Sequence, residues 1–231
     1  MVVFSFITFK SLEKNLRTIV YIDSFNLYFG AVKRTPYRWL DLSKLVLRIC
    51  REQNPSVEIT AIKYFTADIK VFLSQRGQAS WEAQQDYLTS LKAYIPHLEI
   101  IKGSYDISIA RYHPHSDPVG FGVKHDVWRA EEKQTDVNIA INMLCDAHDN
   151  KCEQMVLFTN DSDLAPALCK IKERNNNLKI GVVVPIRGGN RKASVSLQKY
   201  LQSRYWGTSV YFYPGCLSIF IFISIKKWLF R

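Results

Sequence analysis

Acidic residues stand directly after two short apolar segments of this 231-residue chain. The first segment runs into YIDSFN, which places Asp23 and Asn26 after it, and the second runs into FTNDSD, which places Asp161 and Asp163 after it. A further acid, Asp136, opens a helix-like pattern in EEKQTDVN. These side chains can act together only if the fold brings their turns together.

Carboxylates held close together repel one another, so each must raise its pKa or share a cation. Oxygen ligands of this kind suit Mg²⁺ or Mn²⁺, which keep several waters and share a phosphate with a substrate. Such an ion polarises a phosphate oxygen and lowers the pKa of a bound water. The acidic pattern therefore predicts metal-assisted hydrolysis of a phosphodiester.

Strands and helices that would position these acids alternate along the chain. Short runs rich in β-branched and aromatic residues predict strands at 18–22, 57–65, 97–101, 155–159 and 178–184. Helix-period patterns predict helices at 40–51, 80–95, 136–147, 164–174 and 193–204. This alternation predicts an α/β fold with a parallel sheet covered on both faces. In such sheets ligands bind beyond the carboxyl ends of the strands, where Asp23 and Asp161 would lie.

Three local predictions refine this outline. The helix at 136–147 is expected to bury one stripe, which consists of Val137, Ala140, Ile141 and Leu144. A polar, proline-containing segment extends from 102 to about 129, and its HPHSDP part at 113–118 is interpreted as a surface loop. Asp163 is expected to cap the helix that follows it or to support a ligand, and Asp161 is expected to bind the metal directly.

Three segments resemble the NYN domain family, the LabA-like branch of the PIN-like nucleases: 18–30 (TIVYIDSFNLYFG), 131–140 (EEKQTDVNIA) and 158–166 (FTNDSDLAP). They occur in the expected order within a resemblance that extends from about 18 to 201. The resemblance implies a Rossmann-like PIN/NYN fold, with a mostly parallel five-stranded sheet of order 3-2-1-4-5 and helices on both faces. It implies a divalent-metal-dependent endoribonuclease.

The resemblance also implies the residues of the site. Asp23, Asp136, Asp161 and Asp163 would be both catalytic and metal-binding, with Mg²⁺ or Mn²⁺ as the ion and no small-molecule cofactor. Asn26 and Ser162 would contact the RNA substrate. The basic residues Arg187, Arg191 and Lys192, in a loop after the last predicted strand, would hold its phosphates. The family usually has glycine where this chain has Ser24 and Asn160, and phenylalanine where it has Leu164.

Ordinary structural roles compete with these assignments. Asp23 could form a turn, Asn26 could close an Asx-turn, and Asp136 stands where a helix N-cap belongs. Glu131 and Glu132 are expected in a solvated charge cluster, with a smaller chance that one of them reaches the metal. The basic loop could equally be an ordinary flexible loop.

Other functions compete as well. A non-catalytic RNA-binding or regulatory module on the same fold is the alternative function. A phosphatase of the D-x-D type is disfavoured because Asp23 is followed by Ser-Phe-Asn. Tyr28, Phe29 and Tyr37 could stack the bases of single-stranded RNA, whereas Trp39 could equally belong to the core.

Net charge alone does not establish RNA binding. The chain carries 31 basic and 21 acidic residues, a net charge of +10, but residues 18–198 hold only 23 basic and 20 acidic residues. The apolar fraction of 47% provides for a buried core and argues against global disorder.

The cysteines and histidines argue against a disulfide framework or a zinc site. The five cysteines are odd in number and lack a C-x-x-C pair, so reduced thiols are expected. His113, His115, His125 and Asp117 do not have the spacing that zinc sites favour.

We expect three parts in the chain: an N-terminal extension (1–17), the nuclease domain (18–201) and a hydrophobic, basic tail (202–231). The apolar residues 209–225 could be a core strand, a membrane anchor or a non-native extension, and Pro214 and Gly215 interrupt them. A cytoplasmic protein is expected, with membrane anchoring as a minor possibility. Homo-oligomers are possible.

Overall fold

The computed structural model of the chain describes residues 15–114, 122, 124–185 and 194–197. In chain order its elements are β1 (Leu16–Asp23), α1 (Ser24–Leu27), η1 (Tyr28–Val32), α2 (Leu42–Gln53), β2 (Val57–Thr66), η2 (Val71–Leu73), α3 (Gln78–Tyr94), β3 (Leu98–Lys102), β4 (Ser104–Tyr112), β5 (His125–Lys133), α4 (Thr135–His148), β6 (Gln154–Phe158), η3 (Ser162–Leu164), α5 (Ala165–Arg174) and β7 (Lys179–Val183). Within these residues, no helix is long and apolar enough to cross a membrane.

Five parallel strands form the central sheet, in the order β3-β2-β1-β6-β7. The α/β class and the parallel five-stranded sheet are therefore confirmed. The order differs from the predicted 3-2-1-4-5 because two unpredicted strands, β4 and β5, come between β3 and β6 in the chain. β1 is the central strand. The chain adds β2 and then β3 on one side of β1, and later β6 and then β7 on its other side, so the direction of strand addition reverses between β1 and β6. This reversal is where α/β sheets place their ligands.

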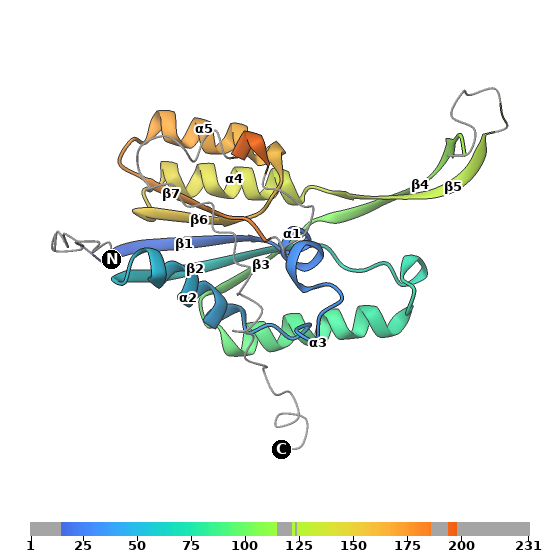
Figure 1. Cartoon of the computed structure of the whole chain (residues 1–231), viewed down its shortest axis with the longest axis horizontal. Helices are drawn as coiled ribbons and strands as arrows, with labels where there is room; N and C mark the ends of the chain where they lie inside the picture. Colours follow the sequence, from blue (N-terminus) through green and yellow to red (C-terminus); the bar gives the residue numbers. More distant parts are fainter. Residues whose placement is uncertain (1–14, 115–121, 123, 186–193, 198–231) are drawn as a thin grey trace, which may run out of the picture.

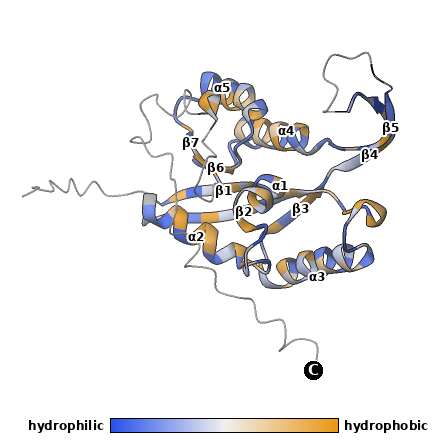
Figure 2. Ribbon diagram, turned by 45° about the vertical axis from the view of Figure 1, so that its right-hand side comes forward, coloured by the Kyte–Doolittle hydropathy of each residue, from blue (hydrophilic) through white to orange (hydrophobic). Residues whose placement is uncertain are grey.

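Helices cover both faces of the sheet, as Figure 1 shows: α4 and α5 lie on one face, and α2 and α3 lie on the other. Successive residues of β1 alternate between the two cores, because strand side chains point to opposite faces. Tyr21 packs with Ile139 of α4 on the first face, whereas Ile22 packs with Val46 of α2 on the second. Hydrophobic residues accordingly recur along the strands and α2 in Figure 2.

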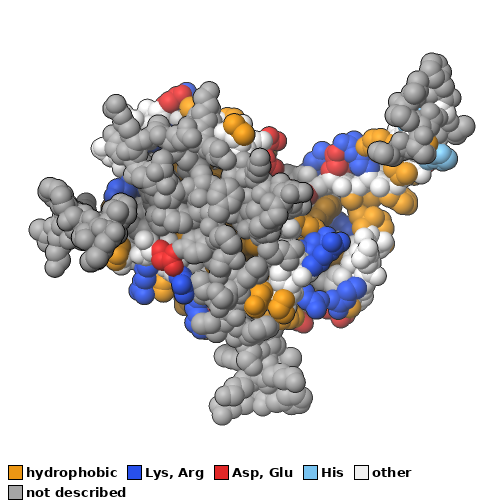
Figure 3. Space-filling model, in the orientation of Figure 1, with side chains coloured by type: hydrophobic (Ala, Val, Ile, Leu, Met, Phe, Trp, Pro, Cys, Tyr) orange, Lys and Arg blue, Asp and Glu red, His pale blue; other side chains and the backbone are white. Residues whose placement is uncertain are grey.

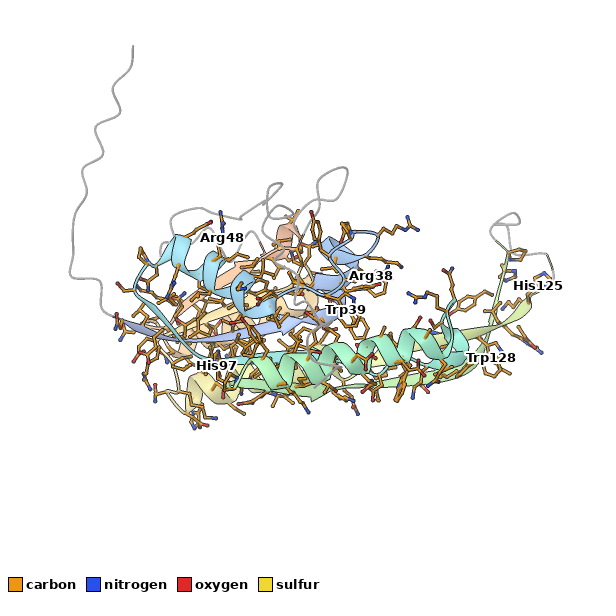
Figure 4. All side chains as sticks on the ribbon, turned by 90° about the horizontal axis from the view of Figure 1, so that it is seen from below. Arg38, Trp39, Arg48, His97, His125 and Trp128 are labelled. Carbon is orange, nitrogen blue, oxygen red and sulfur yellow. The ribbon has the colours of Figure 1, made fainter. Side chains whose placement is uncertain are left out.

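β4 and β5 pair antiparallel and form an arm that projects from one end of the sheet (Figure 1). These two strands were not predicted; of the loop predicted at 113–118, residues 113 and 114 have no regular structure and the others lie outside the described residues. Trp128 and Ile109 face each other across the arm and are 64% and 63% exposed. Figure 4 shows Trp128 and His125 on this arm, at the opposite end of α3 from His97. The arm escaped prediction because its strands carry charged residues on both faces and build no part of the core.

The base of the arm is fixed at the end of the sheet by close backbone packing. A β-carbon on Gly103 would lie 2.6 Å from both a Glu132 side-chain oxygen and the Lys133 carbonyl oxygen, and 2.7 Å from the Thr135 hydroxyl. Only glycine fits this approach, so the chain leaves β3 directly beside the start of α4. Glu132 and Asp136 are thereby carried to the same end of the sheet.

α4 buries a stripe that only partly matches the predicted one, of which Ala140 and Leu144 are partly buried against the core. Val137 and Ile141 are 59% and 53% exposed, whereas Ile139 and Met143 are buried. The buried stripe also contains the polar Asp146. The hydrophobic pattern therefore predicted burial for Val137 and Ile141, which lie on the exposed side of the helix.

The other sequence predictions can be tested in part. The helices at 40–51, 80–95 and 164–174 are confirmed within a few residues as α2, α3 and α5. Of the helix predicted at 193–204, only residues 194–197 are described. Cys50, Cys145, Cys152 and Cys169 are free thiols, as expected, and Cys216 lies outside the described residues. The tail at 202–231 and most of the N-terminal extension also lie outside them.

Candidate metal-binding site at the carboxyl end of the sheet

Asp23 is the last residue of β1, and the register of the sheet determines its neighbours. Ile22 pairs with Phe158 of β6, so the next residue of each strand, Asp23 and Thr159, lie side by side. The Thr159 hydroxyl donates a hydrogen bond of 3.0 Å to Asp23 Oδ2. Both residues are buried, with Asp23 only 2% exposed. Asp23 therefore ends a buried strand and also forms the turn that follows it, because its side chain accepts a hydrogen bond from the backbone N–H of Asn26 and caps α1.

Asn26 connects the two strand ends. Its backbone N–H donates to Asp23 Oδ1 (3.0 Å) and its side-chain amide donates to Asp23 Oδ2 (2.6 Å). The amide oxygen accepts a hydrogen bond of 3.2 Å from the backbone of Asn160. The amide oxygen of Asn160 in turn accepts one of 2.8 Å from the backbone of Ser194. Asn26 therefore does more than close an Asx-turn, because it holds the β1 turn against the β6 turn.

Ser24 and Asn160 stand where the family usually has glycine, and both have side-chain partners here. Ser24 is buried and its hydroxyl is hydrogen-bonded to Tyr64 of β2, whose pKa burial raises well above its usual value. Asn160 does not have a positive φ. Its amide instead makes the bridge to Ser194, a contact that glycine could not make.

Asp161, and not Asp163, caps the helical turn that follows β6. Asp161 Oδ1 accepts a hydrogen bond of 2.9 Å from the backbone of Asp163, which leaves Asp163 exposed in the first turn. The backbone of Asp161 donates to the Thr159 hydroxyl at 3.0 Å. The expectation that Asp163 is the cap is therefore wrong. The cap geometry follows from the extended backbone of Asp161, which lets a short side chain reach back to the turn.

Asp136 lies in the first turn of α4 but does not cap it. The N-cap position belongs to Gln134, whose φ of 78° is left-handed and whose side chain makes no capping hydrogen bond. Glu132 takes that role, because its side chain accepts hydrogen bonds from the backbone N–H (3.2 Å) and the hydroxyl of Thr135. The interpretation of Asp136 as a cap is thus wrong, and its carboxylate remains available to the site.

The pKa values show that the acids influence one another. The pKa of Asp136 is raised to about 6, first by burial and then by the charges of Asp161, Asp23, Glu132 and Asp163, in that order of importance. Burial also raises the pKa of Asp23; hydrogen bonds from its neighbours oppose this shift, and the charge of Asp161 adds to it. Acids from β1, α4 and the β6 turn therefore lie within electrostatic reach of one another. In Figure 1, α1, the start of α4 and the base of the arm meet at this end of the sheet.

The donor chemistry of this cluster fits a hard divalent cation. Carboxylate oxygens are its main donors, and no ion pair joins any of the four aspartates to a lysine or arginine among the residues that the structure describes. The side chains are nevertheless turned to their hydrogen-bond partners. Within the described ranges, no three histidine, cysteine, aspartate or glutamate side chains are arranged to hold an ion together. Binding would require rotation of these carboxylates away from their present hydrogen bonds.

The structure describes only two of the predicted substrate-binding residues, Asn26 and Ser162. Asn26 is at the centre of the site, and Ser162 is exposed in the turn beside Asp161. Arg187, Arg191 and Lys192 lie outside the described residues. His115 and Asp117 of the dismissed zinc cluster lie outside them as well.

Two contributors were missed by sequence reasoning. Thr159 was included only as the last residue of a strand, although its hydroxyl joins Asp23 to Asp161. Glu132 was placed in a solvated cluster, although it is half-buried, caps α4 and raises the pKa of Asp136. The capping-box spacing is reversed here, with the glutamate before the threonine, so the usual helix-start signal did not apply.

The family model of the NYN domain matches residues 17–203. The chain belongs to the NYN domain family. Members of this family are generally nucleases or related hydrolases. The match spans β1, the β6 turn and the start of α4, and it therefore contains all four acids.

Two individual proteins are also similar to the chain. The 6-hydroxy-3-succinoylpyridine 3-monooxygenase HspA of Pseudomonas putida is 35% identical over 207 residues, which cover 80% of this chain and 64% of that protein. The chain thus spans somewhat less than two thirds of this relative. The crystal structure of a protein of unknown function from Vibrio parahaemolyticus is 17% identical, with a TM-score of 0.47, and the match covers 80% of this chain and 89% of that one.

Proposed function

We propose that this NYN domain is a ribonuclease that hydrolyses RNA phosphodiesters with Mg²⁺ or Mn²⁺ at its aspartate cluster. The family supports a nuclease-like domain, and the chemistry of the cluster supports the metal. The PIN-like character of the fold is part of the same proposal.

One observation carries this proposal. Aspartates from three separate parts of the chain gather at the carboxyl end of the sheet, where burial first, and then the charges of Asp161, Asp23, Glu132 and Asp163, raise the pKa of Asp136 to about 6. Such a cluster is costly without a cation, because each carboxylate raises the free energy of the others. Structural aspartates would be expected to have a lysine or arginine partner instead.

The residues of the site would have different roles according to their positions. Asp23, Asp136 and Asp161 would hold the ion, and Asp163, which is exposed beside them, would support a ligand water or a second ion. Asn26 and Thr159 keep Asp23 oriented through their hydrogen bonds. The bound ion would supply charge stabilisation to the phosphate and lower the pKa of a water. The raised pKa of Asp136 suits it to hold a proton when the ion is absent.

The direct test is degradation of single-stranded RNA in Mn²⁺ or Mg²⁺. The wild-type protein should cleave, EDTA should stop the reaction, and Asp161→Asn should be inactive while remaining folded. Equal rates for the wild type and Asp161→Asn would remove the proposal. Tight binding of RNA with no cleavage in either metal would favour a non-catalytic binding module.

A second candidate is supported by the 35% identity to a protein named as a monooxygenase. On this candidate the chain would oxidise a hydroxypyridine such as 6-hydroxy-3-succinoylpyridine. The measurement is dioxygen uptake with that compound and a nicotinamide reductant. Uptake that depends on the compound, together with no RNA cleavage, would favour oxidation over hydrolysis.

A further inference from the structure

Exposed aromatic and basic residues follow directly after the β1 turn. Tyr28 and Phe29 begin η1 and are 41% and 46% exposed. The next residues include Lys33, Arg34 and Arg38, all exposed, and residues 24–38 contain no acid. In Figure 3 lysine and arginine side chains gather beside hydrophobic ones below the base of the arm. This segment therefore combines three positive charges with two large exposed rings.

The rings and one of the cations form an ordered group. Tyr28 meets Phe29 edge to face, with ring centroids 5.2 Å apart and an interplanar angle of 84°. Phe29 is nearly parallel to Phe25 at 6.4 Å. The Lys33 ammonium lies 4.5 Å from the centroid of the Phe29 ring. A cation over a ring face is attracted to it, so Phe29 keeps Lys33 close to Tyr28.

Backbone packing holds this group at the carboxyl end of the sheet. A β-carbon on Gly30 would lie 2.0 Å from the carbonyl oxygen of Pro185, the second residue after β7. η1 therefore lies directly against the chain that leaves β7. Only the single turn of α1 separates Tyr28 from Asp23. The aromatic group is thus an immediate neighbour of the aspartate cluster.

We propose that Tyr28, Phe29 and Lys33 form a binding site for single-stranded RNA, which we call the η1 platform. A base stacks on the ring of Tyr28, and the Lys33 ammonium contacts an adjacent phosphate. Phe29 positions Lys33. This inference rests on the proposed function, because it specifies which form of RNA reaches the aspartate cluster.

Charge favours this occupant over a protein partner. The segment 24–38 has a net charge of +3, which matches a polyanion. Stacking also favours a single strand, because the bases of a duplex are already stacked within the helix and cannot reach a ring.

The first experiment measures binding without cleavage. A fluorescein-labelled oligouridine of about ten nucleotides, roughly the span of one single-strand binding fold, is titrated with protein in EDTA, and its anisotropy is followed. Tyr28→Ala should weaken binding about tenfold, and Tyr28→Phe should retain most of it because the ring remains. Tyr94→Ala is the matched control, since Tyr94 is 50% exposed at the far end of α3. Equal losses for Tyr28→Ala and Tyr94→Ala, or no loss for either, would overturn the platform.

The second experiment separates the phosphate contact from stacking. Loss of one phosphate contact reduces the slope of log K against log salt concentration by about 0.7 for a single strand. Lys33→Gln should show this reduced slope, whereas Tyr28→Ala should leave the slope unchanged. Lys170→Gln on α5, where the lysine pairs with Glu173, is the control. The wild-type protein should also prefer the single strand to a duplex of equal length, and an equal affinity for both would contradict the proposal.

A small phosphodiester distinguishes the platform from the aspartate cluster. Bis(p-nitrophenyl) phosphate has no adjacent base that could reach Tyr28, so its Mn²⁺-dependent hydrolysis tests the cluster alone. Asp161→Asn should abolish this hydrolysis, and Tyr28→Ala should reduce it far less than it reduces the binding of oligouridine. If the wild type does not hydrolyse the diester but binds oligouridine through Tyr28, the proposed hydrolysis fails and the platform stands. If it hydrolyses the diester and Tyr28→Ala binds oligouridine normally, the platform fails alone.

Discussion

Two buried carboxylates lie on the same face of the sheet and differ in their electrostatic environment. Asp23 and Asp146 are 2% and 1% exposed. Asp146 pairs with Lys63 at 2.6 Å and with Lys151 at 3.0 Å, and it accepts a hydrogen bond of 2.8 Å from Tyr21. Asp23 receives hydrogen bonds from neutral groups and has another acid, Asp161, nearby.

The pKa shifts of the two carboxylates have opposite signs. Burial would raise the pKa of Asp146, but hydrogen bonds from Lys63, Lys151 and Tyr21 bring it below its usual value. Burial raises the pKa of Asp23, and among the described residues no lysine or arginine forms an ion pair with it. The protein thus satisfies a buried carboxylate with its own cations at Asp146. On the proposed function, the charge at Asp23 would be balanced by a bound divalent cation.

The largest difference is expected in catalysis. Asp23→Asn should reduce Mn²⁺-dependent RNA cleavage about 1000-fold, because a bound metal contributes several kcal/mol to transition-state stabilisation. Asp146→Asn should keep the wild-type rate per folded molecule, measured well below its melting temperature. Similar losses in the two variants would mean that the two sites do not differ in function.

Stability should show the reverse pattern. Asp146→Asn leaves Lys63 buried without its main partner and should lower the free energy of unfolding by about 3 kcal/mol. Denaturation in urea measures this change, with Lys170→Met as the control at an exposed pair, expected within about 0.5 kcal/mol of the wild type. Asp23→Asn should destabilise the metal-free protein less than Asp146→Asn does, because it costs hydrogen bonds from Asn26 and Thr159 but leaves no described lysine buried without its partner. A loss as large as that of Asp146→Asn would contradict this view of Asp23.

Metal should stabilise the protein through the aspartate cluster only. Mn²⁺ at 100 times its dissociation constant should raise the free energy of unfolding by about 2.7 kcal/mol. Asp136→Asn should reduce that gain, and Asp146→Asn should not. Thermal melts with Mn²⁺ and with EDTA give the measurement. An equal gain in all three proteins would locate the ion elsewhere.

The smallest of these effects is a dependence on pH. The pKa of Asp136 is raised from 3.8 to about 6, so the folded protein binds this proton more tightly than the unfolded chain does. Its contribution therefore makes the metal-free protein less stable as the pH rises from about 4 to about 6. Metal affinity should fall about tenfold per pH unit below pH 6, because the proton competes with the ion. Calorimetric titration of Mn²⁺ between pH 5 and pH 7.5, spanning the titration of Asp136, measures this fall.

Asp146 should behave in the opposite way. Its pKa lies below 3.8, so its stabilising contribution is complete at neutral pH and is lost only as the pH falls through that low value. Acid unfolding of Asp146→Asn should therefore lack the part of the transition that the wild type owes to this carboxylate.

An Asp136→Asn protein whose metal affinity still fell below pH 6 would contradict the assignment of that dependence to Asp136.

Much of the site could be predicted because its parts are strand ends. The sequence marks the end of β1 at Asp23 and the end of β6 near Asp161, and a parallel sheet requires both ends to share one edge. The shared edge follows from topology alone. The pairing of Ile22 with Phe158, which brings Thr159 to Asp23, depends on register, and no local pattern encodes register between strands that are far apart in sequence.

The errors occurred where polar residues take positions that apolar patterns usually mark. α4 buries Asp146 and exposes Ile141, because Lys63 and Tyr21 on the sheet satisfy the carboxylate. The arm escaped prediction because its strands contribute nothing to the core. Glu132 caps α4 from the last turn of that arm, a role visible only once β5 is in place.

The sequence by itself determined the family, the alternation of strands and helices, and the acids that end two of the strands, because these depend on local residue patterns and on spacing along one chain. The tertiary structure decided which carboxylates have cationic partners and which do not. Lys63 is far from Asp146 along the chain and meets it only through the packing of α4 on the sheet, and the same packing brings Asp136 to Asp23 and Asp161, with which no lysine or arginine of the described part of the chain forms an ion pair. Electrostatic balance depends on distance in space, so it could be known only from the folded chain.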